Sequence, residues 1–185
     1  MRIIAGKHKS RKLVALEGLN TRPMMDKMKE TIFNIIGPYF TGDIVLDLFG
    51  GSGALSLEAI SRGAAHANIV EVSKDAIRII KENIASLREE DTTTLYNLDY
   101  QLALNIFARE HKKFNLIFLD PPYRLNIMKE IIDFIITNDL LAKEGIIVCQ
   151  YVRNNYLPQE TEILEIRKNF NYASSEVCIY QKKEV

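Results

Sequence analysis

Apolar positions alternate between two patterns once the chain leaves its N-terminal region. Short runs rich in β-branched residues predict strands near 44–48, 67–72, 93–98 and 115–119, with a fifth over 145–152. Between these runs, apolar residues recur every three or four positions, which is the spacing of a helix with one buried face. Because helices separate the strands, we expect the strands to be parallel in an α/β sheet.

The clearest helix spans 74–88, where isoleucine and leucine residues form a single apolar stripe. Similar stripes predict a helix from 26 to about 36 and another around 128–135. Towards the C-terminus the pattern changes, because 162–170 and 175–181 alternate without a helix between them. These two segments predict an antiparallel pair of strands at the end of the sheet.

The N-terminal region combines a predicted β-hairpin with a high positive charge. Its strands are expected at Arg2–Ala5 and Leu13–Leu16, around a polar turn at Gly6–Lys12 and outside the main sheet. Residues 1–30 contain eight Lys or Arg residues against three Asp or Glu residues, whereas the whole chain has a net charge of zero. A basic arm beside a neutral or acidic body favours contact with phosphate.

Composition is that of an ordinary soluble domain. The 185 residues are 47% apolar and 26% charged, which is enough for one sizeable core. No apolar run approaches a membrane span, and the basic N-terminus lacks the apolar stretch of a secretory signal, so we expect a cytoplasmic protein. Cys149 and Cys178 are expected to be reduced core thiols. The three histidines are scattered without metal-ligand spacing, so no metal is expected.

A glycine-rich turn follows the first predicted strand. The strand ends at Asp47, and the turn contains Phe49, Gly50, Gly51, Ser52 and Gly53. Glycine lets the backbone approach a ligand closely, and the helix that follows offers unpaired N–H groups at its N-terminus. The Gly-x-Gly-x-x-Gly dinucleotide pattern is not met, because Ser56 stands at the third glycine position. Since Asp47 would repel a pyrophosphate, the turn favours a ligand with a cationic amino end.

Four predicted strands end in an acid: Asp47, Glu71, Asp99 and Asp120. Ligands of open α/β sheets bind at the carboxyl ends of the strands, so four acids there indicate a shared site. Glu71 lies about 20 residues beyond the glycine turn, which is the spacing of an acid that binds ribose hydroxyls. Asp99 taken alone would be interpreted as a helix cap.

The tetrapeptide Asp120-Pro121-Pro122-Tyr123 follows the fourth predicted strand. Each proline fixes its own φ, removes a backbone donor and holds the preceding residue in an extended conformation. The result is a stiff arm that carries a carboxylate, free carbonyls and an aromatic ring at fixed spacing. Asp120 and the Pro121 carbonyl suit the two N–H groups of an amine on a flat heterocycle, and Tyr123 suits its face.

These motifs resemble those of S-adenosylmethionine-dependent amino-methyltransferases. More specifically, Arg2–Leu13, Thr21–Pro23, Glu30–Asn34 and Leu57–Ala64 resemble the bacterial RsmD family, which methylates the exocyclic N2 of a guanine in 16S ribosomal RNA. The resemblance covers nearly the whole chain. It implies a Rossmann-like class I methyltransferase fold, with a seven-stranded, mostly parallel sheet and an antiparallel C-terminal hairpin. Departures from the family pattern include Gln150, which stands where an acid is common.

The resemblance also implies a role for each motif. Asp47 and the backbone of the glycine turn would face the methionine end of the cofactor, and Glu71 would bind its ribose. Asp99 and the Tyr100 backbone would meet the adenine. The full expected cofactor set is Asp47, Phe49, Gly50, Gly51, Ser52, Gly53, Glu71, Val72, Asp99 and Tyr100. Asp120, Pro121 and Tyr123 would hold the target base, which must leave any helical stack to reach them.

The basic N-terminal part would then contact ribosomal RNA or the small-subunit particle. The expected RNA-binding residues are Lys7, Lys9, Arg11, Lys12 and Arg22. Arg22 is equally compatible with a salt bridge to a nearby acid. We therefore expect an RNA-contacting extension over 1–40 and an S-adenosylmethionine-binding domain over 41–185, in a monomer.

Two rival functions remain open at this point. A DNA adenine-N6 methyltransferase fits because the Asp-Pro-Pro-Tyr arm suits any planar amine, although the chain lacks an evident added domain for reading DNA. A non-catalytic RNA-binding assembly factor could keep the same fold, although four strand-end acids argue against it. An NAD-dependent dehydrogenase is weaker still, because of Ser56 and the Asp-Pro-Pro-Tyr arm.

Overall fold

A computed structural model describes residues 1–16, 26–122, 127–156, 158–172 and 175–184. Within those residues, seven strands form one sheet: β1 (Ile44–Asp47), β2 (His66–Glu71), β3 (Thr93–Asn97), β4 (Phe114–Leu119), β5 (Leu141–Val152), β6 (Leu164–Tyr172) and β7 (Ser175–Lys182). The helices are α1 (Asp26–Ile36), α2 (Ala54–Ser61), α3 (Lys74–Leu87), α4 (Tyr100–Arg109) and α5 (Met128–Thr137), with a short 3-10 turn, η1 (Glu90–Thr92).

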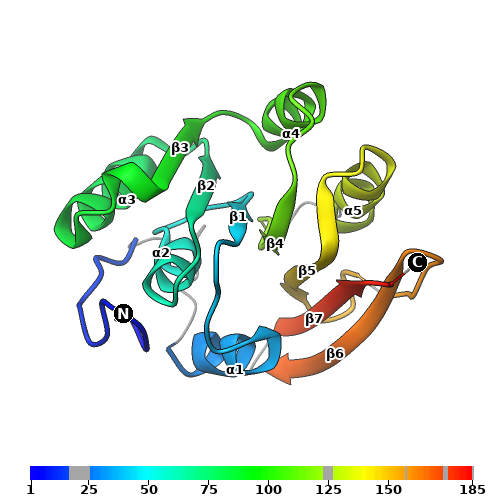
Figure 1. Ribbon diagram of the computed structural model, residues 1–185, viewed down its shortest axis with the longest axis horizontal. Helices are drawn as coiled ribbons and strands as arrows, with labels where there is room; N and C mark the ends of the chain where they lie inside the picture. The colour runs from blue at the N-terminus through cyan, green and yellow to red at the C-terminus, as the bar shows by residue number, and fades with distance from the viewer. Residues whose placement is uncertain (17–25, 123–126, 157, 173–174, 185) are drawn as a thin grey trace.

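The strands lie in the order β3-β2-β1-β4-β5-β7-β6 (Figure 1). The first five in this order are parallel, and β7 runs antiparallel to both β5 and β6. The expected Rossmann-like sheet with an antiparallel C-terminal hairpin is therefore confirmed. Because the chain runs outward from β1 in both directions, the β1–β4 boundary is a topological switch point, the usual ligand position in such sheets.

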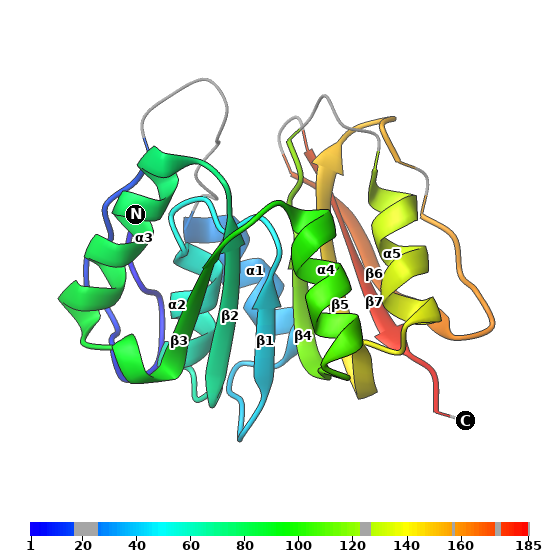
Figure 2. The same cartoon turned by 90° about the horizontal axis from the view of Figure 1, so that it is seen from above.

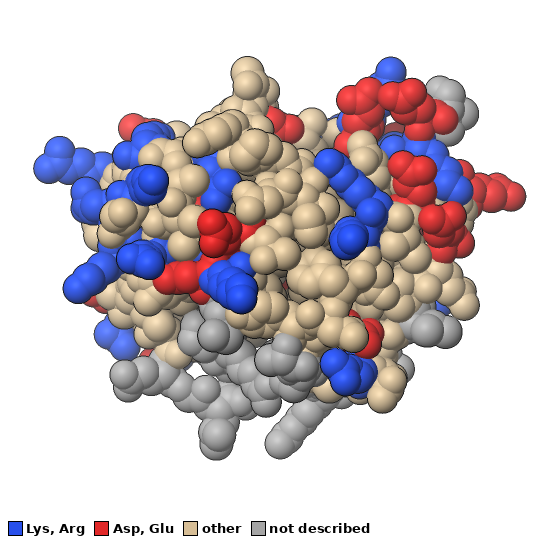
Figure 3. Space-filling model, turned by 90° about the horizontal axis from the view of Figure 1, so that it is seen from below, with Lys and Arg blue, Asp and Glu red and all other residues tan. Residues whose placement is uncertain are grey.

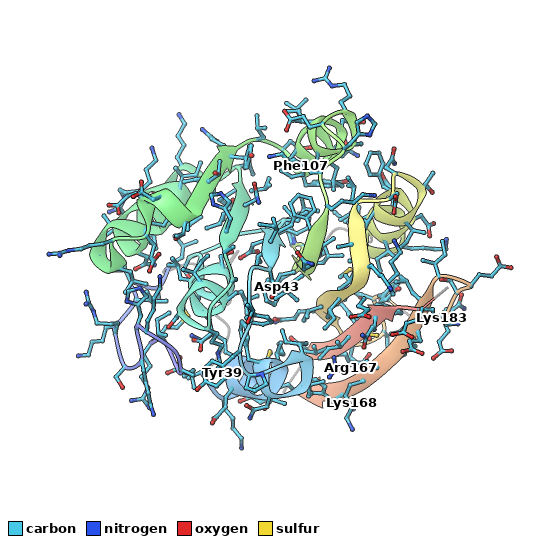
Figure 4. The ribbon with its side chains drawn as sticks, in the orientation of Figure 1. Tyr39, Asp43, Phe107, Arg167, Lys168 and Lys183 are labelled. Carbon is cyan, nitrogen blue, oxygen red and sulfur yellow. The ribbon has the colours of Figure 1, made fainter. Side chains whose placement is uncertain are left out.

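Alternating side chains of the strands build a hydrophobic layer on each face of the sheet. Helices cover both faces (Figures 1 and 2). Val45 and Phe118 belong to the layer that α1, α2 and α3 cover. Leu46, one residue further along β1, belongs to the layer under α4 and α5. Phe107 lies on the sheet side of α4 and packs edge-on against Phe114, with ring centroids 5.3 Å apart (Figure 4).

One strand is longer than the sequence pattern indicated, because β5 begins at Leu141 rather than at Gly145. Phe114 pairs with Leu141, and the register then shifts before Leu116 pairs with Ile146. Extra residues are accommodated on β5 in an irregular stretch, since Glu144 has φ 57°. The exposed, charged residues in this stretch interrupt the apolar run. The apolar pattern therefore did not indicate that the strand begins at Leu141.

The N-terminal hairpin forms in outline, but its regular part is shorter than expected. Within the described first 16 residues, strand pairing is limited to one bridge between Arg2 and Lys12. The reason is that the next backbone donors bond elsewhere: the amides of Ile4 and Ala5 donate to the Glu58 carboxylate at 2.9 and 3.1 Å. The predicted strands therefore give way to an irregular arm, residues 1–16, that is bonded to the helices.

Three buried side chains, Lys29, Glu58 and Arg62, hold this arm and α1 against α2; we call them the arm-docking cluster. Glu58 accepts hydrogen bonds from Lys29 Nζ at 3.2 Å and from Arg62 Nε at 2.7 Å. Each cation makes a further bond, because Lys29 Nζ donates to the Arg2 carbonyl and Arg62 donates to the Pro38 carbonyl. Each charge in the cluster is thus both paired and hydrogen-bonded.

Further contacts bring the arm close to α2 and α3. The Lys7 amide donates to the Ser61 carbonyl at 2.8 Å, and Asn83 of α3 exchanges two hydrogen bonds with the backbone of Val14. A Cβ on Gly6 would lie 1.8 Å from the Ser61 oxygen, so only glycine allows this approach. The arm is consequently fixed to the body of the protein along most of its length.

In the described part of the chain, every helix is too short or too polar to span a bilayer. Cys149 and Cys178 are buried and free, as expected. They lie far apart in the sequence but face each other as a cross-strand pair between β5 and β7.

Candidate functional site

The ends of β1 and β4 bring two of the predicted acids together. Asp47 is the last residue of β1 and pairs in register with Phe118, two residues before Asp120. Side chains two residues apart on a strand share a face, so Asp47 and Asp120 both belong to the face covered by α1 and α2. In this arrangement the charge of Asp47 raises the pKa of Asp120.

Both carboxyls are harder to ionise than ordinary aspartates. Burial raises the pKa of Asp47 to about 7, although a hydrogen bond donated by Ser56 Oγ at 3.0 Å opposes this increase. Burial also raises the pKa of Asp120 to about 7, and the Asp47 charge adds to the increase. Perturbed carboxyls at a switch point are typical of functional sites rather than of structural ion pairs.

The glycine turn begins α2 and lies beside this pair. Gly51 has φ 57° and Gly53, at the N-cap of α2, has φ 75°, conformations that favour glycine. The Gly50 amide donates to the Val70 carbonyl at 2.9 Å, which ties the turn to β2. A Cβ built on Gly51 would meet no atom within 4 Å, so the turn is open to a ligand at that residue.

Glu71, at the end of β2, supports the turn directly. One carboxylate oxygen accepts from the Gly51 amide at 2.9 Å, and the other accepts from the amides of Val72 and Ser73, each at 2.8 Å. The predicted ribose-binding acid therefore also fixes the conformation of the glycine turn. Its outer neighbour Val72 is 65% exposed, which is unusual for a large aliphatic residue at a strand end.

The third strand contributes the remaining predicted cofactor residues. Asp99 is the N-cap of α4, and its side chain accepts from the Gln101 amide at 2.9 Å. The structure therefore confirms the helix-cap interpretation of Asp99, and Oδ1 is the oxygen that makes the cap. Tyr100, the first residue of α4, packs its ring against Phe49 of the glycine turn, with centroids 5.5 Å apart. Together they connect the ends of β1 and β3.

Two supporting residues were not predicted from the sequence. Ser56 appeared there only as a mismatch to a dinucleotide motif, yet it is fully buried and bonds to Asp47. Asn83 donates to the Ser52 carbonyl at 2.9 Å while bonding to Val14 of the arm, so it connects the arm with the glycine turn. The sequence did contain a signal for Ser56, because a small hydroxyl residue in the first turn of α2 faces back towards β1. Asn83 gave no local signal.

Four of the five predicted RNA-binding residues belong to the described arm. Lys7, Lys9, Arg11 and Lys12 are all exposed, and Lys and Arg residues gather on the side of the arm and α3 (Figure 3). Two of them also bond to the body: Lys7 pairs with Glu89 at 2.6 Å, and Arg11 donates to the Ser86 carbonyl at 2.6 Å. Lys7 and Arg11 thus have docking roles that the charge pattern alone did not indicate.

Two predicted residues, Tyr123 and Arg22, lie outside the described residues. Pro121 is buried and follows Asp120 directly at the end of β4. Among the residues that the structure describes, no group of three or more His, Cys, Asp or Glu side chains is placed to hold a metal ion.

Comparisons with known proteins agree with this geometry. Residues 1–181 match the family model described as conserved hypothetical protein 95. The chain is 40% identical over 183 residues to the putative rRNA methyltransferase YlbH of Bacillus subtilis, covering 99% of this chain and 100% of that protein. It is 34% identical to ribosomal RNA small subunit methyltransferase D of Escherichia coli K12, covering 85% of this chain and 78% of that protein.

A solved structure described as the putative methyltransferase yhhF from Escherichia coli superimposes with a TM-score of 0.84 and 29% identity. The superposition covers 99% of this chain and 98% of the other. The match thus includes the N-terminal arm as well as the sheet. The chain therefore belongs to the conserved hypothetical protein 95 family, the RsmD-type methyltransferases, as its sequence motifs indicated.

Proposed function

We propose that this protein transfers a methyl group from S-adenosylmethionine to the exocyclic N2 of a guanine in 16S ribosomal RNA. The observation that carries the proposal is the meeting of Asp47, the open turn at Gly51 and Asp120 at the β1–β4 switch point. The names of the two relatives support a ribosomal RNA substrate, and one of them specifies the small subunit. The choice of guanine N2 rests on the resemblance of the motifs.

The cofactor residues fit the chemistry of S-adenosylmethionine, which supplies a methyl group on an already activated sulfonium. Asp47 is buried with a raised pKa, and a cationic amino group beside it would restore its ionised form. The open side of Gly51 leaves room for the methionine part. Exposed Val72 offers an apolar surface to a flat ring, and Glu71 offers carboxylate oxygens to ribose hydroxyls.

Asp120 and Pro121 act on the acceptor. An aromatic amine is a weak nucleophile because its lone pair is delocalised into the ring. N–H bonds to the Asp120 carboxylate and the Pro121 carbonyl favour a tetrahedral nitrogen whose lone pair points at the methyl carbon. As the N–C bond forms and the S–C bond breaks, a carboxyl with a pKa of about 7 can take the proton that nitrogen releases. From its place in the motif, Tyr123 would stack on the base, and this stacking contact would contribute ~1–3 kcal/mol.

The N-terminal part over 1–40 would hold the RNA while the domain over 41–185 performs the chemistry. The arm is docked by buried bonds rather than free, so its exposed cations are presented in fixed positions. Lys9 and Lys12 are exposed and have no ion pair within the described chain, which makes them the best candidates for phosphate contact. Asn83 links this arm to the glycine turn, so the two parts are mechanically connected.

The decisive experiment supplies methyl-labelled S-adenosylmethionine with three substrates: small subunits that lack the modification, naked 16S ribosomal RNA and duplex DNA. Labelled products are digested and the modified nucleoside is identified by mass spectrometry. We expect N2-methylguanosine from a single position in the RNA and no label in DNA. Methyladenine in DNA would instead establish the DNA adenine-N6 activity.

An Asp120→Asn variant serves as the matched control, because it keeps the size of the side chain and removes its charge. We expect it to bind S-adenosylmethionine normally in calorimetry and to transfer little methyl. The unaltered protein could instead bind RNA tightly, fail to bind the cofactor and transfer no label. That result would support the non-catalytic assembly factor and overturn the proposal.

A further inference from the structure

Gln150 of β5 is a buried polar side chain whose oxygen is unsatisfied. The side chain is 4% exposed, and its Oε1 atom is fully buried with no hydrogen-bond partner in the described part of the chain. Most buried polar atoms in folded proteins have such a partner, because losing water without a replacement destabilises the native state. An orphaned carbonyl oxygen therefore points to a ligand that supplies the missing donor.

The sheet register places Gln150 beside the proposed acceptor site. Leu119 of β4 pairs with Cys149 of β5 in parallel, so Asp120 and Gln150 occupy the next pair of positions. Gln150 follows Val148 by two residues on β5, and Val148 belongs to the layer that contains Phe118. Gln150 therefore lies on the same face of the sheet as Asp120 and Asp47.

Apart from Asp120, the described residues around Gln150 offer little to bind a carboxamide. Its neighbour across the β5–β7 pairing is Val177, which is fully buried, and Val148 lies on the same face. A structural role for the amide would require partners like those of Asn68, which is equally buried. Asn68 donates to the Val45 carbonyl and accepts from the Tyr96 hydroxyl. Gln150 thus pays the desolvation cost without the compensation that Asn68 has.

We propose that Gln150 is a specificity-determining residue that recognises the ring edge next to the amine being methylated. This inference rests on the proposed function and adds how the base is chosen. Asp120 accepts from the exocyclic amine, and the Gln150 carboxamide, one strand away, rotates so that its Oε1 accepts from the adjacent ring N1–H. Its amide NH₂ is then free to donate to the O6 oxygen.

This pairing selects guanine over adenine by hydrogen-bond polarity. Guanine places an N1–H donor beside its amine and an O6 acceptor beyond, which matches the oxygen and NH₂ of a carboxamide. Adenine places a bare acceptor nitrogen beside its amine, which an unpaired amide oxygen would repel. Sites that provide a hydrogen bond discriminate strongly against analogues that cannot complete it, because buried groups are then left unpaired.

The test uses 16S ribosomal RNA that carries either guanine or 2-aminopurine at the mapped target position, assembled into subunits if the enzyme requires them. 2-Aminopurine keeps the amine but lacks N1–H and O6. Single-turnover methylation by the unaltered protein should favour guanine by about 10- to 100-fold, as expected when a buried polar group is left unpaired with the analogue. In Gln150→Met, which keeps the shape and removes both polar groups, this ratio should fall close to one.

The same variant separates specificity from a structural role. Gln150→Met should bind S-adenosylmethionine with unchanged Kd and should melt at the same or a higher temperature, because it removes an unsatisfied buried group. Asn68→Met, the control, should melt at a lower temperature and keep the guanine preference. If Gln150→Met does not fold, Gln150→Leu provides the same comparison, and failure of both to fold would overturn the inference in favour of a structural role.

Each remaining outcome is decisive. A guanine preference that persists in Gln150→Met would overturn the inference and leave the proposed function intact, as would an absence of preference in the unaltered protein. Failure of the unaltered protein to form N2-methylguanosine on any RNA would instead overturn the proposed function itself.

Discussion

Two groups of buried polar side chains in this protein are built in opposite ways. In the arm-docking cluster, Glu58 has an ion-pair partner on each side and accepts two backbone amides besides. At the strand ends, Asp47 is hydrogen-bonded by Ser56 and by backbone amides but has no counter-charge in the described chain, and Gln150 has an oxygen without any partner there. The first group is complete within the protein. Within the described residues, the second group lacks a counter-charge for Asp47 and a donor for the Gln150 oxygen, which a bound ligand would supply.

This difference distinguishes residues that stabilise the fold from residues that act in the chemistry. A fully paired buried cluster fixes the position of the arm, and removing one member leaves an uncompensated charge. An incompletely paired cluster lowers stability in the empty protein but offers preorganised acceptors to incoming N–H groups. Substitutions in the first group should therefore impair folding, whereas substitutions in the second should impair chemistry and spare or improve folding.

The largest expected effect is on folding, from Glu58→Gln. The change leaves Lys29 and Arg62 buried without a counter-charge and should lower the free energy of unfolding by about 3–5 kcal/mol, as measured by urea denaturation. The same type of change in an exposed pair, Asp133→Asn opposite Lys129, should cost at most about 1 kcal/mol. Equal losses in the two variants would refute the distinction.

The next effect is on catalysis, from Asp120→Asn. Methyl transfer should fall by about 10²–10³-fold, because the amide lacks the charge that holds the target amine and cannot take its proton. Cofactor Kd, measured by calorimetry, should stay within about threefold, and the melting temperature should not fall. A variant that transfers methyl at nearly the normal rate, or one that unfolds, would place Asp120 in the structural group instead.

A smaller effect concerns pH. Folding raises the pKa of Asp47 and of Asp120 to about 7, so the native protein binds more protons than the unfolded chain between about pH 4 and pH 7. Their contribution to stability is therefore present at low pH and is lost as the pH rises through that interval. Relative to the unaltered protein, the double variant Asp47→Asn/Asp120→Asn should therefore become more stable as the pH rises from 4.5 to 7.5.

Denaturant titrations at the two pH values measure this difference. Acids elsewhere in the chain titrate in both proteins and cancel in the comparison. A stability difference that is independent of pH would mean that these two carboxyls ionise normally.

The smallest expected effect distinguishes two pairs of cations within the arm. Lys9→Ser/Lys12→Ser should reduce the slope of log affinity for RNA against log salt by about 1.5 and leave the melting temperature unchanged. Lys7→Ser/Arg11→Ser removes two cations as well, but it also removes bonds to Glu89 and to the Ser86 carbonyl, so it should lower the melting temperature. An unaltered salt slope in the first pair would remove the arm from the RNA interface.

Sequence alone was sufficient for the sheet and for the acids at its edge, because both depend on local patterns. Apolar periodicity placed the strands, and the acids that end β1 and β2 and follow β4 could be located directly. It was insufficient wherever distant segments meet. Glu58 looks like a surface residue on α2 until the amides of Ile4 and Ala5 reach it. The unsatisfied oxygen of Gln150 depends on neighbours from two other strands, which no local pattern encodes.

The β6 edge of the sheet has a consequence for how the protein behaves when concentrated. An open edge strand exposes unpaired backbone groups on which strands of other molecules can add. In β6 the register shifts between Ile166 and Lys168, and the exposed cations Arg167 and Lys168 lie at this irregularity (Figure 4). An edge with an irregular register and exposed cations is a poor template for intermolecular sheet growth, so this surface should resist aggregation even in crowded solution.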